Sequence, residues 1–158
     1  MAHRGVATVA LSLMICFLLL GHFDEQFFLI HFYESLIYLV IVLLLFYAEV
    51  RWAYMLGIVA PAGWLLLMLP TGGFEEFARE VGRAFHGNAS TNPAGLLGAT
   101  ISVLSVAMIG LCAWRWKRQF TGLGKGLSTL LVSSGIVAAY YGVMILWFWR
   151  SVMAPFHI

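Results

Sequence analysis

The chain has 158 residues, of which 62% are hydrophobic and 10% are charged, and its formal net charge is +2. Soluble domains carry roughly 25% charged residues, and a soluble fold of this size could not hide so much apolar surface from water. The composition therefore excludes an ordinary soluble domain, and so small a net charge gives no reason to expect a nucleic-acid partner. We expect a single all-α domain that is a polytopic integral membrane protein.

Five apolar stretches are long enough to cross a bilayer, which takes roughly 20 residues of α-helix. The first follows Arg4 and is similar to a signal peptide, but it has no small-x-small cleavage site, so we expect a retained anchor. Glu49 and Arg51 divide a longer run, because each charge at mid-bilayer would cost about 2.5–3.5 kcal/mol. The predicted spans are 5–21, 27–48, 52–70, 96–113 and 127–149.

The segment FEEFAREVGRAF, residues 74–85, has a different pattern from the apolar runs. Phe74, Phe77, Val81 and Phe85 recur at helical spacing, and charged residues occupy most of the remaining positions. This pattern predicts a short amphipathic helix that lies in the headgroup region. The alternative is a helix that packs on another subunit through the same phenylalanines.

Lysine and arginine are unevenly distributed between the two ends of the predicted bundle. Six lie on the side of the amino terminus and three on the other, which predicts a cytoplasmic amino terminus and a carboxyl terminus outside. Short loops are typical of a bacterial inner-membrane protein. Between the last two spans, WRWKRQFTGLGKG is predicted to be a basic, glycine-rich connector. It contains four basic residues that could bind anionic lipid headgroups: Arg115, Lys117, Arg118 and Lys125. The alternative is that these charges only set the orientation of the chain in the membrane and bind no specific lipid.

The stretch GHFDEQFFLIHFYESL combines histidines and acidic residues between two apolar runs. His31, Glu34 and Tyr38 lie at positions i, i+3 and i+7, and so on one face of the second span. An ionisable residue within a span is costly unless it faces the bundle, water or a partner. We interpret His31 and Glu34 as a structural hydrogen-bonded pair, with Tyr38 as its polar neighbour. The alternatives are a proton or ion site, and an axial histidine ligand.

The turn before this span supplies a second candidate site. His22, Asp24 and Glu25 face outward in the predicted topology and could form an outer-face ligand site, although their spacing matches no zinc motif. The sequence requires no metal or cofactor. A tetrapyrrole or carotenoid contact is compatible with a place in a larger complex.

The last span contains small residues at the spacing that lets two helices approach closely. Gly135 and Ala139 are four residues apart, as are Ala138 and Gly142. This spacing predicts a helix-packing surface. We expect the partner helix to come from the same chain, with a seam between subunits as the alternative.

No serine–histidine–acid order, catalytic pair of carboxylates or nucleotide loop occurs, so we do not expect an enzyme. The predicted function is a small accessory or structural subunit of a larger integral membrane complex, for which energy-transducing (respiratory or photosynthetic) complexes are candidates. Its expected partners are other integral membrane subunits and membrane lipids. The alternatives are a small transporter or channel that uses Glu34, and a haem- or chlorin-holding protein with His31 as axial ligand.

Overall fold

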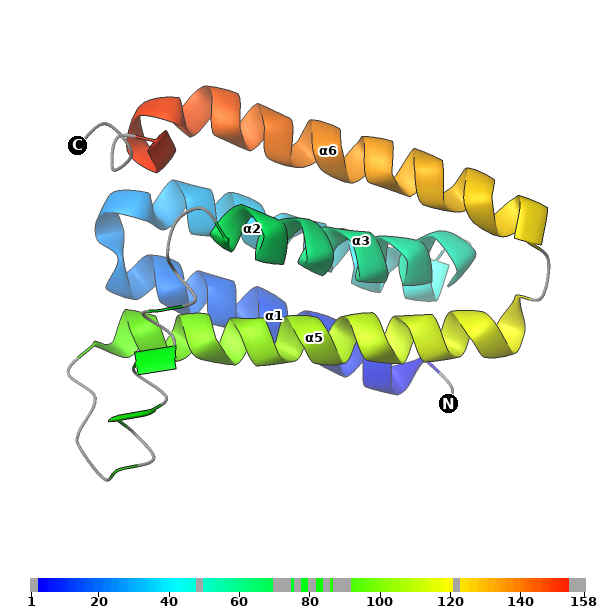
Figure 1. Ribbon diagram of the computed structural model, residues 1–158, viewed down its shortest axis with the longest axis horizontal. Helices are drawn as coiled ribbons and strands as arrows, with labels where there is room; N and C mark the ends of the chain where they lie inside the picture. The colour runs from blue at the N-terminus through cyan, green and yellow to red at the C-terminus, as the bar shows by residue number, and fades with distance from the viewer. Residues whose placement is uncertain are drawn as a thin grey trace.

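The computed structural model describes residues 3–47, 50–69, 75, 78–79, 82–83, 86, 92–120 and 123–153, with side chains of the last helix from 126 to 147. This part of the chain is helical, and five of its helices are long and apolar enough to cross a membrane by length and composition. Figure 1 shows them lying side by side along one direction. They are α1 (Arg4–Phe23), α2 (Phe28–Tyr47), α3 (Val50–Met68), α5 (Pro93–Gln119) and α6 (Leu123–Met153), with a short 3₁₀ helix, η1 (Glu25–Phe27), after α1.

The breaks between the first three helices occur where the sequence predicts them. The α1–α2 turn is tight: the Asp24 N–H donates to Leu20 O at 2.9 Å, and the Phe27 N–H donates to Asp24 O at 3.0 Å. The long apolar run is divided beside Arg51, since α2 ends at residue 47 and α3 begins at residue 50. Helix α3 then continues through Pro61.

Helix α5 is longer than the predicted span at both ends. The Asn92 side chain caps its start by accepting from the N–H groups of Ala94 and Gly95 at 3.1 and 3.3 Å, and Pro93 occupies the first turn. Lysine and arginine in the last turn are favourable at the negative end of the helix dipole. The prediction of a connector over WRWKRQFTGLGKG is therefore largely wrong, because α5 continues to residue 119 and α6 begins at residue 123.

Four helices form a bundle, and the fifth is attached to its side. Helix α1 packs against α2 and α5, and α3 also packs against α2 and α5, which closes the four-helix arrangement. Helix α6 packs on α3 and touches α2, so it lies along one side of the bundle, as Figure 1 shows. Helix α6 therefore has one face on the protein and another directed away from it.

Aromatic rings and close helix approaches fill the interior. Phe17 of α1 stacks on Tyr38 of α2 with ring centroids 5.5 Å apart, and it meets Trp64 of α3 edge to face at the same separation. At Gly57 helix α3 lies very close to α5, because a Cβ there would lie 2.6 Å from Cys112 Sγ. At the opposite end of the bundle from Asp24, His3 Nδ1 lies 2.8 Å from the Tyr54 hydroxyl.

The amphipathic helix predicted for residues 74–85 lies mostly outside the described residues. Its placement in a headgroup region stays a prediction.

Candidate functional site at Glu34

The Glu34 carboxylate is buried in the bundle, and both of its oxygens have partners. His31 Nδ1 lies 2.9 Å from Glu34 Oε2, one turn earlier on α2, and Trp64 Nε1 of α3 donates to Glu34 Oε1 at 3.1 Å. Glu34 is only 3% exposed. A buried carboxylate without partners would be strongly unfavourable, so these two contacts account for its presence in an apolar interior. They also tie α2 to α3.

His31 stands between two carboxylates that differ in exposure. Its Nε2 lies 3.9 Å from Asp24 Oδ2, and Asp24 is far more exposed than Glu34, with side-chain exposures of 37% and 4%. Gly21 allows this arrangement, because a Cβ there would lie 3.1 Å from a ring carbon of Phe28 and 3.4 Å from His31 Cβ. The result is a polar series from the α1–α2 turn into the bundle.

The polar series extends one turn below Glu34. Tyr38 and Ser105 are both fully buried, and neither hydroxyl makes a hydrogen bond of good geometry within the described part of the chain. The two side chains are nevertheless near enough to interact. Beyond Tyr38, the sequence of α2 from residue 39 to 46 is entirely apolar. The polar series therefore ends near the middle of the bundle.

Tyrosines of α6 close the side of this cluster. Tyr33 and Tyr140 stack with ring centroids 4.3 Å apart, and the hydroxyl of each donates to the backbone carbonyl of the other. The Tyr141 hydroxyl donates to Ala60 O of α3 at 3.1 Å. Both contacts hold α6 at the level of the Glu34 cluster.

The structure places His31, Glu34 and Tyr38 on one side of α2, with His31 beside Glu34 and with Glu34 and Tyr38 both buried. The predicted outer-face group is not brought together in the same way: Asp24 approaches His31, whereas His22 and Glu25 are exposed. The His22 ring contacts Phe23 instead. Among the residues with described positions, no three His, Cys, Asp or Glu side chains converge as metal ligands would.

Sequence reasoning missed Trp64 as a member of the site. A signal for it was present, because a buried indole N–H needs an acceptor and a buried carboxylate needs donors. Trp64 and Glu34 both lie near the Asp24 end of their predicted spans, so their depths match. Pairing residues by depth on different spans would have suggested the contact.

The predicted small-residue surface of α6 faces away from the bundle. Gly135, Ala138 and Ala139 are exposed, and no atom lies within 4 Å of a Cβ built at Gly135 or Gly142. The expectation that these residues pack inside the chain is therefore wrong. The reason is that α6 buries the opposite side of its helix against α3.

The predicted basic patch gathers around one tryptophan at the end of α5. The guanidinium carbons of Arg115 and Arg118 lie 4.8 and 4.2 Å from the Trp114 ring centroid. Lys117 is exposed on the same turn. The side chain of Lys125, the fourth predicted member, lies outside the described residues.

The arrangement at Glu34 supports hydrogen bonding and proton binding more directly than ligation. The Nδ1 of His31 is taken by Glu34, and its Nε2 faces Asp24, so an axial ligand to a tetrapyrrole would have to use the nitrogen beside that carboxylate. No protein family, curated protein or solved structure matches this chain.

Proposed function

We propose that the chain crosses a bilayer five times and acts as a small accessory subunit that binds another membrane protein through α6. In this proposal the amino terminus lies on the cytoplasmic side of a bacterial inner membrane. A single observation carries the accessory role: among the described helices, none covers the small-residue surface of α6. Energy-transducing complexes are one class of assembly in which we would look for the partner.

Helix α6 is divided into two opposite stripes. The buried stripe packs on α3 and consists of Thr129, Ser133, Val137, Tyr141 and Met144. On the other side lie Gly135, Ala138, Ala139 and Gly142, flanked by Leu131 and Leu146, which are 65% and 77% exposed. We call this second set the α6 outer stripe.

The composition of the outer stripe favours a protein helix over lipid as its neighbour. Lipid tails are as apolar as leucine, so helix association in a bilayer depends on close van der Waals packing, to which small residues contribute by letting backbones approach. Leu131 and Leu146 stand at the two ends of the small residues and would pack on either end of the contact. The outer stripe would therefore bind a partner helix through close packing of the two backbones, and not through greater hydrophobicity than lipid.

The test is purification of the tagged chain from its native membranes in a mild detergent, followed by mass spectrometry. We expect other integral membrane proteins to co-purify in fixed proportion. Gly142→Leu should reduce their recovery, because the leucine fills the space that a partner backbone would occupy.

The matched control is Val143→Leu, which adds bulk at the next residue, outside the outer stripe. Val143 is 49% exposed, so this change should leave both folding and recovery of the partner intact. A monodisperse monomer without companions, or equal recovery with both variants, would overturn the accessory role.

A second candidate function, proton exchange from the Asp24 end, is favoured by the position of His31 between two carboxylates. Among the described residues, the titratable groups around Glu34 include Asp24 from the turn, His31, Tyr33 and Tyr38 from α2, and Tyr140 and Tyr141 from α6. Proton flux into liposomes that contain the purified chain should then fall in Glu34→Gln. Proton flux into liposomes that persists in that variant would exclude transport through Glu34.

A further inference from the structure

The end of α5 presents three cationic side chains, Arg115, Lys117 and Arg118, and neither α5 nor α6 contains a carboxylate side chain. Arg115 and Arg118 both lie over the Trp114 ring, and the sequence after Glu80 contains neither Asp nor Glu. Guanidinium forks bind phosphate oxygens in a bidentate manner, and exposed tryptophans typically sit at headgroup level. The charge of this end is therefore complementary to a phosphodiester.

An exposed apolar face of α5 leads directly away from this cluster. Val103, Val106, Gly110, Trp114 and Lys117 follow one another at steps of three or four residues, and so share one face of the helix. All five are exposed, and Val103 and Val106 are 68% and 61% exposed. No atom lies within 4 Å of a Cβ built at Gly110, which makes the middle of this face smooth and open. We call it the α5 outer face.

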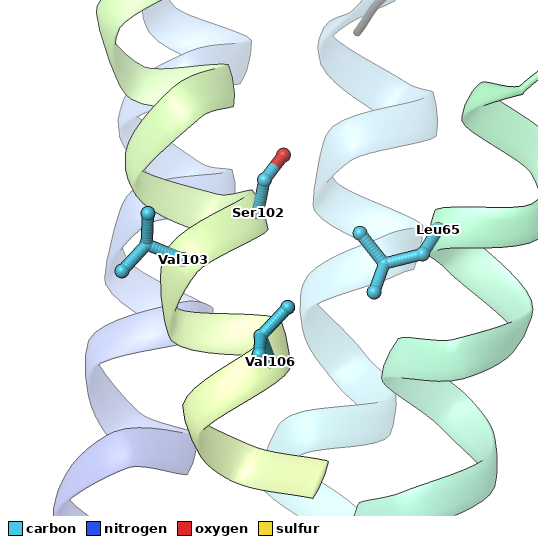
Figure 2. Close-up of a pocket in the computed structure, with 4 residues that line it drawn as sticks. All are labelled: Leu65, Ser102, Val103 and Val106. Carbon is cyan, nitrogen blue, oxygen red and sulfur yellow. The ribbon is translucent and has the colours of Figure 1, made fainter. Parts of the chain in front are cut away.

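The α5 outer face runs into a groove between α5 and α3. Figure 2 shows Ser102, Val103 and Val106 on α5 and Leu65 across from them on α3. The groove has a volume of about 370 Å³ and opens to the outside of the bundle. Ser102 donates its hydroxyl to Gly98 O at 2.9 Å, so this side chain keeps its donor within its own helix. The groove suits an alkyl chain better than a polar molecule.

The distance between cluster and groove matches one leaflet of a membrane. Trp114 and Val103 are eleven residues apart, which corresponds to roughly 16 Å at about 1.5 Å per residue. One leaflet contributes about half of the roughly 30 Å hydrocarbon thickness. A phospholipid with its headgroup beside Trp114 would therefore reach the groove with the end of an acyl chain.

We propose that the α5 outer face binds an anionic phospholipid, with the phosphate on Arg115 and Arg118 and one acyl chain along Gly110 and Val106 into the groove beside Leu65. The proposal rests on the proposed membrane topology, and it does not depend on a partner at α6.

Native mass spectrometry of the purified chain in detergent tests the site, with phosphatidylglycerol and phosphatidylcholine of identical acyl chains as probes. We expect the wild type to bind phosphatidylglycerol more tightly. A basic residue near an anionic lipid surface contributes about fivefold in affinity, so Arg115→Gln with Arg118→Gln should weaken phosphatidylglycerol binding about thirtyfold. Binding of phosphatidylcholine should change little.

Two further variants separate this site from general electrostatics and from a headgroup-only contact. Arg4→Gln removes the same charge from an exposed position at the start of α1 and should preserve the preference. Gly110→Leu places a side chain on the α5 outer face without a clash and should weaken both lipids.

Equal binding of the two lipids, or an equal loss with Arg4→Gln, would overturn the site. An unchanged affinity in Gly110→Leu, or glycerol phosphate binding as tightly as the lipid, would overturn the position of the acyl chain. Insertion into vesicles is measured separately for every variant, since a chain that fails to insert contradicts the proposed topology and not this site.

Discussion

Replacing Gly57 by alanine tests how closely α3 approaches α5. A Cβ at this position would lie 2.6 Å from Cys112 Sγ and 3.0 Å from Met108 Cε. The end of a methionine can rotate away, but the Cys112 sulfur is one bond from its Cβ in a side chain with no exposed surface. We therefore expect the added methyl group to force the two helices apart.

The magnitude follows from two opposing effects. Overpacking an interior typically costs about 1–3 kcal/mol, whereas exchanging glycine for alanine within a helix contributes about 1 kcal/mol of favourable propensity. Gly135→Ala in α6 gains the propensity without the clash, since no atom lies within 4 Å of its Cβ position. Gly57→Ala should therefore be less stable than Gly135→Ala by about 1–3 kcal/mol.

Reversible unfolding in mixed micelles of mild detergent and dodecyl sulfate, followed by helical circular dichroism, measures this difference. Cys112→Ala supplies a rescue, because the nearest remaining atom of residue 112 would be its Cβ, 3.7 Å from the new methyl group. Gly57→Ala should cost much less in the Cys112→Ala background than in the wild type. Equal stability of Gly57→Ala and Gly135→Ala, or a rescue that fails, would refute the close contact.

Three other outcomes follow from the same geometry. Trp64→Phe deprives Glu34 Oε1 of its donor and should lower the free energy of unfolding by about 1.5–3 kcal/mol, more than Glu34→Gln, which keeps an acceptor for the indole; the same unfolding assay compares them. Tyr141→Phe removes a hydroxyl that donates from α6 to α3 and should cost about 0.5–1.5 kcal/mol in that assay. In mild detergent, maleimide should modify half-buried Cys16 but should reach buried Cys112 only after denaturation, and mass spectrometry of native protein with labelled Cys112 would contradict this burial.

The sequence predicted the helices well but their ends less well. The predicted spans were chosen so that each apolar stretch matches the thickness of the hydrocarbon layer. This criterion correctly separated α2 from α3 beside Arg51. Helices also continue beyond that layer, so the polar last turns of α5 were assigned to a connector. The Asn92–Pro93 pair could have predicted where α5 begins, because a capping side chain followed by proline is a helix-start signal that does not depend on hydropathy.

In the candidate site, the contact within one helix could be predicted from the sequence, whereas the contact between helices could not. His31 and Glu34 are one turn apart on one helix, so spacing alone predicted their contact. Trp64 is 30 residues from Glu34 in sequence, and only the packing of α2 against α3 brings them together. The exposure of Gly135 could not be read from its spacing, because small residues at four-residue intervals suit a partner from either the same or another chain.

Helix α3 connects the Glu34 cluster with the exposed helix. Trp64 donates to the Glu34 carboxylate, and one turn earlier the Ala60 carbonyl accepts from the Tyr141 hydroxyl. Gly63 gives the Tyr141 ring room, because a Cβ built at Gly63 would lie 3.1 Å from a carbon of that ring. A change in the charge of Glu34 has no polar route along the apolar second half of α2. It can, however, alter the hydrogen bond to Trp64, and the same turn of α3 bears the contacts that position α6. We therefore expect the stability of the α6 attachment to depend on Glu34 through α3, so that Glu34→Gln and Tyr141→Phe should be non-additive in unfolding free energy.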